Sequence, residues 1–437
     1  MTYIKWQDYA EHGGLINLKK YITLLFSFLI LFSVSYADID FDINCSSAIL
    51  INAKNGEILY EYNAHDKAYP ASTTKVLTAL LALENENDYS KEIIPSHYAI
   101  YSVPVGSSIA YFSEGENLTF EQVMYGLLLP SGNDAANIIA EEIAGSISNF
   151  VSMMNDRAVE LGAKNTNFTN PSGSHDNNHY TTAYDLSLFA REAMKHEKFR
   201  EIVSSSSYTM PATNRSDKTR EFVNTNKLLS PNHQYYYEYA TGMKTGYTSN
   251  ARNCLISSAS RNGVDLIAVV LGGTTTANNK SAIYTDSRNL LDYGFSCYKK
   301  TTIAKEGDTI TQVVPKRSKN KVAIVAVLKN NIRMIHKSNE SPEFTTNIEL
   351  NKELIAPINK GDVVGKISYF DGEELIAESE LIADNSIEKE PWYSVAFKII
   401  IKIIVVIISI FLLFIILLII FNKIRRFKNR NRERIFY

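Results

Sequence analysis

Three short motifs in this 437-residue chain contain the residue types of an acyl-transfer site built on an active serine. Ser72 and Lys75 belong to the first motif, Ser131 and Asn133 to the second, and Lys244 begins the Lys-Thr-Gly of the third. A serine hydroxyl is a poor nucleophile until a nearby base takes its proton. Each motif alone recurs by chance, but the three in this order predict such a nucleophile with its base.

The base in this prediction is Lys75. An apolar run over 76–83 predicts a helix that has Ser72 in its first turn, at the positive end of the helix dipole. Residues three apart share a helix face, so the Lys75 amine lies within reach of the Ser72 hydroxyl. The amine must be neutral to accept a proton, and burial together with a second cation, for which Lys244 is the candidate, would lower its pKa. The alternative is an ordinary surface lysine.

The second motif interrupts a helical pattern, because Pro130 and Gly132 break the helix and an alanine-rich segment restarts it. Such a loop projects side chains into a cleft. We expect Ser131 to pass a proton between Lys75 and a leaving amine, and Asn133 to donate to a substrate amide carbonyl. Helix capping by Ser131 or Asn133 is an alternative role, and it is compatible with both functions.

The third motif has the pattern of an edge strand. We expect Gly246 to let the substrate backbone approach and pair along this strand, and Lys244 and Thr245 to hold a terminal carboxylate. The oxyanion of a tetrahedral intermediate needs two N–H donors, most simply those of Ser72 and Tyr247, and each such contact is worth about 3 kcal/mol.

The elements that must position these motifs follow an α+β pattern. Asn55-Gly56 joins two short strand-like segments near the start, and Asn262-Gly263 joins two more directly after the third motif. Between these hairpins the apolar residues recur at helical spacings, over 120–129, 135–144, 147–161 and 183–194. We therefore predict one antiparallel sheet, closed by distant segments and covered by a helical cluster.

The chain also contains segments outside this unit. Past residue 293, short alternating segments broken by Gly, Asn and Asp predict a small all-β unit that serves as a spacer or docking module. The expected order is a signal region over 1–37, a catalytic domain over 38–295, a β-rich domain over 296–385, a linker over 386–398, a transmembrane helix over 399–421 and a basic cytoplasmic tail over 422–437.

Both ends of the chain carry targeting signals. Two lysines, an apolar run over 21–34 and the small-x-small pattern before Asp38 predict a cleaved signal peptide. An uncleaved anchor is the alternative, but the run is shorter than the roughly 20 residues that a bilayer crossing needs. Residues 1–17 are too long and mixed for the start of a signal peptide, which suggests a true translation start near Leu18.

Near the other end, the apolar stretch over 403–421 is long enough to cross the roughly 30 Å hydrocarbon layer. Trp392 and Tyr393 would anchor its outer end, and the basic residues over 423–434 place the tail in the cytoplasm by the positive-inside rule. A surface-lying amphipathic helix would need a polar face, which this segment lacks.

Charge and cysteine content exclude further classes. The formal net charge is -2 and the body has no basic stripe, so nucleic acid is not an expected partner. The three cysteines, Cys45, Cys254 and Cys297, are an odd number without metal-type spacing, so we expect small core residues and no disulfide framework.

With the motifs placed, the segment over 38–295 resembles the low-molecular-weight penicillin-binding proteins, the serine-type D-alanyl-D-alanine carboxypeptidases. The residues over 70–75, 129–136, 179–183, 242–248 and 291–295 carry this resemblance, and the β-rich unit and C-terminal anchor match the family layout. The resemblance implies the α+β fold shared with serine β-lactamases. It also implies that Ser72 is the nucleophile, Lys75 the base and Ser131 the proton relay, with Asn133, Lys244 and Thr245 binding substrate.

The activity implied by this resemblance is removal of the terminal D-alanine from peptidoglycan pentapeptide stems through an acyl-Ser72 intermediate. β-Lactam antibiotics would be covalent inhibitors, and no metal or organic cofactor is expected. One position departs from some family members, which carry an arginine after the Gly-Gly of the last sheet strand to orient the substrate carboxylate. Here Gly273 is followed by Thr274, so recognition of the carboxylate would rest on Lys244 and Thr245 alone.

Three alternatives stay open. A membrane-tethered β-lactamase would use the same nucleophile, but no E-x-x-x-N element follows the second motif to supply a deacylating glutamate. A non-catalytic penicillin-binding receptor would signal through its helix, but the short basic tail leaves no cytoplasmic output domain. A zinc peptidase would recruit His175, Asp176 and His179, but these lie in a loop pattern and not on the helix that an i, i+4 ligand pair requires.

Overall fold

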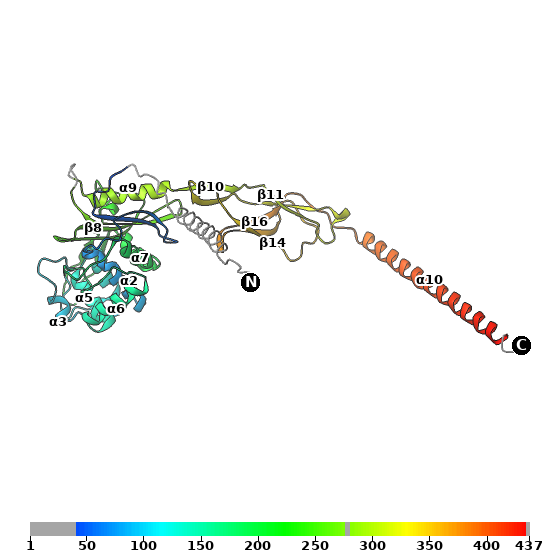
Figure 1. The fold of residues 1–437 in the computed structure, drawn as a ribbon, viewed down its shortest axis with the longest axis horizontal. Coiled ribbons are helices and arrows are strands. Elements are labelled where there is room, and N and C mark those ends of the chain that lie inside the picture. The colour runs from blue at the N-terminus through cyan, green and yellow to red at the C-terminus, as the bar shows by residue number, and fades with distance from the viewer. Residues whose placement is uncertain (1–40, 276–279, 434–437) are drawn as a thin grey trace, which may run out of the picture. The chain divides into compact units, whose positions relative to one another are not determined.

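A computed structural model describes residues 41–275 and 280–433 of the chain (Figure 1). The described chain divides after Tyr298 into two compact units. The predicted signal peptide over 1–37 lies outside the described residues.

The first unit is built on a five-stranded antiparallel sheet with the strand order β2-β1-β9-β8-β7. Both predicted Asn-Gly turns are present, and Gly56 and Gly263 have positive φ angles of 78° and 86° that favour glycine. β1 pairs with β9 along its length, so the sheet is closed by segments far apart in sequence, and β7 lies at an edge, as predicted. The strands are β1 (Ser47–Asn52), β2 (Ile58–Tyr62), β7 (Ala240–Thr248), β8 (Arg252–Arg261) and β9 (Val264–Gly273).

Helices cover both faces of this sheet, which confirms the predicted α+β class. α9 (Ala282–Ser296) packs on one face, and α7 (Ala183–Ala193) packs on the other with the helical cluster beyond it (Figure 1). The cluster contains η1 (Ala71–Thr74), α2 (Lys75–Asn85), α3 (His97–Tyr101), α4 (Phe120–Leu128), α5 (Asn133–Ala144), α6 (Ile147–Glu160) and α8 (Glu197–Ser204). Short elements join these helices: β3 (Glu92–Ile93), β4 (Leu118–Thr119), β5 (Ser207–Met210), β6 (Arg220–Val223) and η2 (Lys227–Leu229).

α2 is the central helix of the cluster. Its residues from Lys75 to Leu83 are all buried, including the fully covered Val76 and Leu80. Burial of each side chain of Val or Leu size contributes about 1.5–3 kcal/mol. The position of Lys75 at the start of this helix is therefore fixed by the core itself.

The second unit is a β-rich fold followed by one long helix. Its larger sheet has the order β11-β12-β16-β15-β14, and β10 pairs with β13. Ile324, Leu328, Ile367 and Leu381 are among the residues of its own hydrophobic core. The elements are β10 (Tyr298–Ala304), β11 (Thr309–Val313), η3 (Lys319–Lys321), β12 (Ile324–Leu328), β13 (Ile332–Lys337), β14 (Thr345–Leu350), β15 (Val363–Asp371), β16 (Glu374–Ala383) and α10 (Trp392–Glu433).

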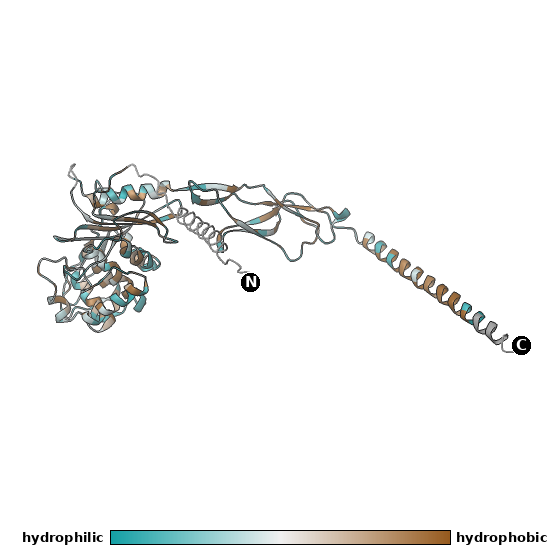
Figure 2. Cartoon of the chain, viewed as in Figure 1, coloured by the Kyte–Doolittle hydropathy of each residue, from teal (hydrophilic) through white to brown (hydrophobic). Residues whose placement is uncertain are grey.

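α10 is longer than the expected membrane helix. It begins inside the predicted linker over 386–398 and continues into the predicted tail, because Pro391 precedes it and no Gly or Pro follows before Glu433. The span from Trp392 to Arg426 is long and apolar enough to cross a membrane (Figure 2).

The carboxylate of Asp286 ties the start of β1 to α9. It is fully buried and accepts the backbone N–H groups of Asn44 at 2.7 Å and Cys45 at 2.8 Å. Asp286→Ala is expected to lower the free energy of unfolding by about 2–4 kcal/mol, because one buried and one part-buried donor lose their acceptor. Urea unfolding measures this loss. The exposed Asp265→Ala is the control, with an expected change within about 0.5 kcal/mol; equal losses in the two variants would contradict the assignment.

Candidate active site

The first motif forms the end of a tight turn. Ser72 lies in the 3₁₀ turn η1, not in the first turn of an α-helix, and Lys75 is the first residue of α2. In a 3₁₀ helix the side chains at i and i+3 eclipse, so Lys75 stands directly above Ser72. The distance from Lys75 Nζ to Ser72 Oγ is 3.1 Å.

Lys75 Nζ has two further partners, and both are carbonyl oxygens. It donates to Asn133 Oδ1 at 2.6 Å and to the backbone oxygen of Ser172 at 2.8 Å. A neutral amine has two N–H groups and one lone pair. Since the two carbonyls can only accept, the N–H groups point to them, and the lone pair is left facing the hydroxyl of Ser72. The neutral form of Lys75 is therefore satisfied in the geometry that proton transfer needs.

The environment of Lys75 also favours this neutral form. The side chain is fully buried, and burial lowers its pKa well below the ordinary value of 10.5. The nearby charge of Lys244 lowers the pKa further, while the carboxylate of Asp134 acts in the opposite direction. Both causes expected from the sequence act on this group.

The Lys244 side chain is buried beneath β7. It is fully buried on β7, donates from Nζ to the backbone oxygen of Thr245 at 2.9 Å, and burial lowers its pKa to about 7. Its side chain does not line the cleft in the described structure. Lys244 could therefore affect a ligand in the cleft through its electrostatic field, or through its hydrogen bond to the backbone of Thr245.

The second motif is a strained loop. Ser131 has a φ of +68°, a conformation that costs energy for a residue with a side chain, and such strain clusters at functional sites. Its buried Oγ has no hydrogen-bond partner within the described chain. Asn133 starts α5, and its backbone N–H donates to the oxygen of Ser108 at 2.9 Å. The loop thus presents an unpaired hydroxyl beside Lys75's amide partner.

Gly246 meets a packing requirement that the sequence did not indicate. A Cβ at this position would lie 2.9 Å from the backbone nitrogen of Ser72 and 3.0 Å from the Pro70 oxygen and the Thr73 nitrogen. Glycine is required here because β7 packs directly against the turn that carries Ser72. Gly246 also lines the cleft, and the expected approach of substrate backbone stays a prediction. Tyr247 follows it, with an exposed side chain at the rim.

These groups meet in one cleft of about 740 Å³. Among the described residues, no Lys, Arg, Asp or Glu side chain lines it. The site residues on its walls are Ser72, Ser131, Asn133, Thr245, Gly246 and Tyr247. A hydroxyl-rich cleft with two lysines buried behind its walls suits an anionic ligand without offering it a direct ion pair.

A loop that the sequence did not single out supplies the carbonyl for Lys75. Asn170 Oδ1 accepts the backbone N–H groups of Ser172, Gly173 and Ser174 at 3.2, 2.8 and 3.0 Å. This fixes the Ser172 carbonyl toward Lys75. The Asn-Pro-Ser-Gly run predicts a turn. Every residue has a backbone carbonyl, however, so the sequence does not show that this one contacts Lys75.

His179 holds the turn from the other side. Its Nδ1 accepts the backbone N–H of Thr169 at 3.2 Å, so its proton is on Nε2, which lies 2.9 Å from Thr74 Oγ1. Thr74 in turn donates to the oxygen of Ala71 at 2.9 Å, and Ala71 has a φ of +48°. Burial lowers the pKa of His179 to about 4, so the ring stays neutral at physiological pH. The histidine thus supports the strained residue that precedes Ser72.

The zinc alternative finds no support in this geometry. Both ring nitrogens of His179 have protein partners, and across residues 41–275 and 280–433 no group of three His, Cys, Asp or Glu could hold a metal.

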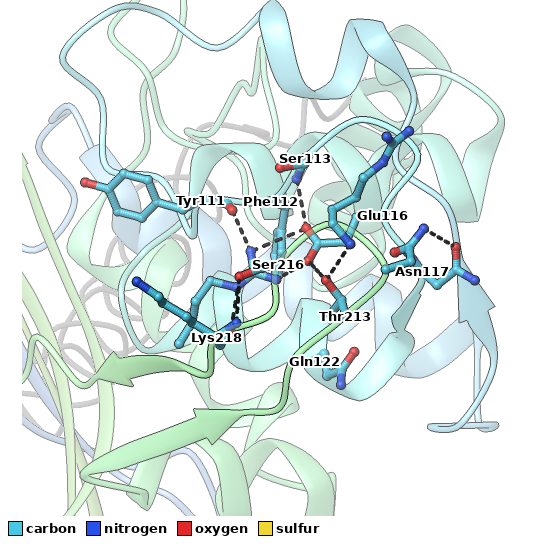
Figure 3. Close-up of polar contacts among 12 residues, drawn as sticks. Tyr111, Phe112, Ser113, Glu116, Asn117, Gln122, Thr213, Ser216 and Lys218 are labelled. Atoms are coloured by element: carbon cyan, nitrogen blue, oxygen red, sulfur yellow. Dashed lines mark hydrogen bonds and ion pairs between the residues drawn. The ribbon is translucent and has the colours of Figure 1, made fainter.

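A buried ion pair supports the loop of the second motif from outside. Glu116 is fully buried and pairs with Arg220; it also accepts from Ser113 N at 2.9 Å and Thr213 Oγ1 at 2.5 Å (Figure 3). Arg220 donates to the oxygen of Tyr111 at 2.5 Å. The neighbouring residues Ala110 and Phe112 donate their backbone N–H groups to Asp134, next to Asn133. The pair therefore fixes the segment against which the Ser131 loop is built.

A serine, a buried lysine and an adjacent unpaired hydroxyl are the groups that a serine acyl-transfer site requires. The D-alanyl-D-alanine carboxypeptidase family model matches residues 33–275, more than half of the chain, and the model of the penicillin-binding protein 5 C-terminal domain matches residues 298–389. The chain belongs to the D-alanyl-D-alanine carboxypeptidase family.

Individual proteins agree with this assignment. The chain is 32% identical over 347 residues to D-alanyl-D-alanine carboxypeptidase DacF of Bacillus subtilis, covering 78% of this chain and 86% of the relative. It is 30% identical to DacA of Haemophilus influenzae, covering 84% and 93% of the two chains. Among solved structures, DacD from Francisella tularensis has a TM-score of 0.55 at 25% identity, covering 82% and 96%. The Streptomyces K15 DD-transpeptidase has a TM-score of 0.53 at 31% identity, covering 60% and 100%.

Removal of one partner of the Glu116 and Arg220 pair should destabilise the fold. Arg220→Met leaves a buried carboxylate unpaired, and we expect it to lower the free energy of unfolding by about 3–5 kcal/mol. Lys195→Met breaks the more exposed pair with Glu192 and should cost less than about 1 kcal/mol. Thermal unfolding of both variants measures the difference, and similar midpoints would contradict the structural role of the pair.

Loss of the His179 contact should slow attack by Ser72. His179→Phe removes the donor to Thr74 at similar volume, and we expect acylation of Ser72 by benzylpenicillin to slow by about tenfold, in line with one buried hydrogen bond. His179→Gln retains a donor and should recover part of the rate. Stopped-flow acylation measures both. A wild-type rate in His179→Phe would show that the turn does not depend on this contact.

Proposed function

We propose that this chain is a serine-type D-alanyl-D-alanine carboxypeptidase that removes the terminal D-alanine of peptidoglycan pentapeptide stems through an acyl-Ser72 intermediate. Family membership supports the reaction class. The observation that carries the proposal for this chain's own residues is the position of Lys75 Nζ, which lies 3.1 Å from Ser72 Oγ and bonds to two carbonyl oxygens. In a neutral amine this arrangement turns the lone pair toward the Ser72 hydroxyl.

Acylation then proceeds in two steps. Ser72 Oγ attacks the carbonyl of the penultimate D-alanine while its proton passes to Lys75, and the backbone N–H groups of Ser72 and Tyr247 receive the oxyanion. The C–N bond breaks as Ser131 delivers a proton to the departing amine and takes one from Lys75. Terminal D-alanine leaves, Ser72 carries the acyl group as an ester, and Lys75 is neutral again.

Deacylation uses the same groups on water. The oxygen of a water molecule attacks the ester while Lys75 takes a proton from that water. Lys75 then returns the proton to Ser72 Oγ as the C–O bond of the ester breaks. The shortened stem leaves with a carboxyl group. Asn133 would orient the substrate amide, and Thr245, with the field of Lys244 behind it, the terminal carboxylate. A β-lactam would acylate Ser72 in the same way, but its ring-opened amine stays attached to the acyl group and inhibits the enzyme.

The location of the protein is a further part of the proposal. α10 supports anchoring to a membrane, since Trp392 to Arg426 is long and apolar enough to span one. The basic residues after the apolar stretch favour a cytoplasmic tail, which would leave the catalytic domain outside the cytoplasm. The β-rich unit would then be a spacer between the catalytic domain and the anchor. A signal peptide over 1–37 would account for export.

Mass spectrometry of the full-length protein in detergent tests the mechanism. Treatment with benzylpenicillin should add the drug's mass to the peptide that contains Ser72, and Ser72→Ala should abolish the adduct. Incubation with a pentapeptide stem should release free D-alanine. An adduct on another residue would overturn the mechanism, rapid release of hydrolysed drug would indicate a β-lactamase, and a stable adduct without D-alanine release would indicate a receptor.

A further inference from the structure

Neutral groups make up the described lining of the cleft that would receive a substrate carboxylate. Its lining contains no Lys or Arg side chain in the described parts of the chain, and the residues over 274–279, after the last sheet strand, include none by sequence. The proposed substrate nevertheless ends in a carboxylate. Its recognition must therefore come from neutral donors in the cleft, supported by the field of the buried lysines.

A pair of hydroxyl groups occupies the wall beside the nucleophile. Thr225 Oγ1 and Thr245 Oγ1 lie 2.6 Å apart, and both residues line the cleft. Each hydroxyl has one proton, and one proton is enough for the bond between them. The pair therefore retains a second proton that can be donated to a ligand, and donation along a chain of hydroxyls strengthens each bond.

The backbone of Thr225 is held by two separate elements. Its backbone N–H donates to the oxygen of Leu129, at the end of α4, at 3.2 Å, and its own oxygen accepts from the hydroxyl of Tyr284 on α9 at 3.3 Å. Its neighbours in the chain, Asn224 and Asn226, are both buried. A donor fixed in this way loses little entropy on binding, which is what recognition of a charged group requires.

We infer that Thr225 is a specificity residue, and that the Thr225–Thr245 hydroxyl pair binds the C-terminal carboxylate of the substrate in place of a cationic side chain. This inference rests on the proposed function. The sequence indicated Thr245, together with Lys244, but not Thr225, which stands twenty positions earlier and outside the three motifs. Lys244 contributes from behind the strand, since it is bonded to the carbonyl of Thr245.

The inference is tested by the ratio of two rates. Full-length enzyme in detergent is assayed with a peptide ending in D-Ala-D-Ala and with the same peptide ending in a neutral C-terminal amide. Thr225→Val should lower the carboxylate-to-amide ratio of kcat/KM by about tenfold to a hundredfold, as for loss of a hydrogen bond to a charged group. Thr225→Ser, which keeps the hydroxyl, should keep the wild-type ratio.

A purely structural role of Thr225 would slow both peptides equally and leave the ratio unchanged, which would overturn the inference. Arg252→Gln and Lys280→Gln serve as controls for nearby cations outside the lining. Both variants should retain the wild-type ratio. A large fall of the carboxylate-to-amide ratio in either variant would assign carboxylate recognition to that cation and overturn the inference.

A second readout separates this inference from the proposed function. If the wild-type enzyme releases no D-alanine but is acylated by penicillin, the proposed function fails. The acylation rates of benzylpenicillin and its methyl ester then replace the two peptides. Thr225→Val should again reduce the preference for the free carboxylate. An unchanged preference would contradict the assignment of carboxylate binding to Thr225.

Discussion

The site depends on one constraint: the Lys75 amine is buried where a positive charge is energetically unfavourable. Two carbonyl oxygens, from Asn133 and Ser172, take the N–H groups of Lys75, and the remaining direction points to Ser72. Among the described residues, an ammonium here would gain no carboxylate partner at hydrogen-bond distance, and it would lie near a second buried lysine, Lys244. Burial therefore favours the neutral amine, and in the proposed mechanism the geometry directs proton transfer from Ser72 to Lys75.

Much of the surrounding structure serves to hold these few atoms in place. The apolar core fixes α2, and thereby Lys75, while β7 approaches the turn of Ser72 so closely that Gly246 has no room for a side chain. On the other sides, His179 acts through Thr74, and the turn capped by Asn170 presents its carbonyl. Each contact alone is modest, but together they prevent the turn from relaxing.

The sequence predicted the elements whose signals are local. Both Asn-Gly hairpins, the edge strand β7 and the helical cluster follow from turn chemistry and periodicity, and the α+β class follows from their order. It also predicted that Ser72 and Lys75 lie close together, and Lys75 Nζ is 3.1 Å from Ser72 Oγ, while their chemical roles stay a prediction. It could not predict the Ser172 carbonyl or the Thr225 hydroxyl, because backbone acceptors and lone threonines have no pattern, and only folding brings them to the cleft. Nor could it predict that Gly246 packs against the turn of Ser72, because the neighbour that excludes a side chain there is distant in sequence.

The protonation state of Lys75 is the most direct test of this account. Lysine labelled with ¹³C at Cε allows its titration to be followed by NMR in the full-length protein in detergent, with Lys75→Arg to assign the signal. The account predicts that Lys75 loses its proton at a pH well below its ordinary pKa of 10.5. A Lys75 signal that stays protonated up to that ordinary value would contradict it, because Ser72 would then have no base.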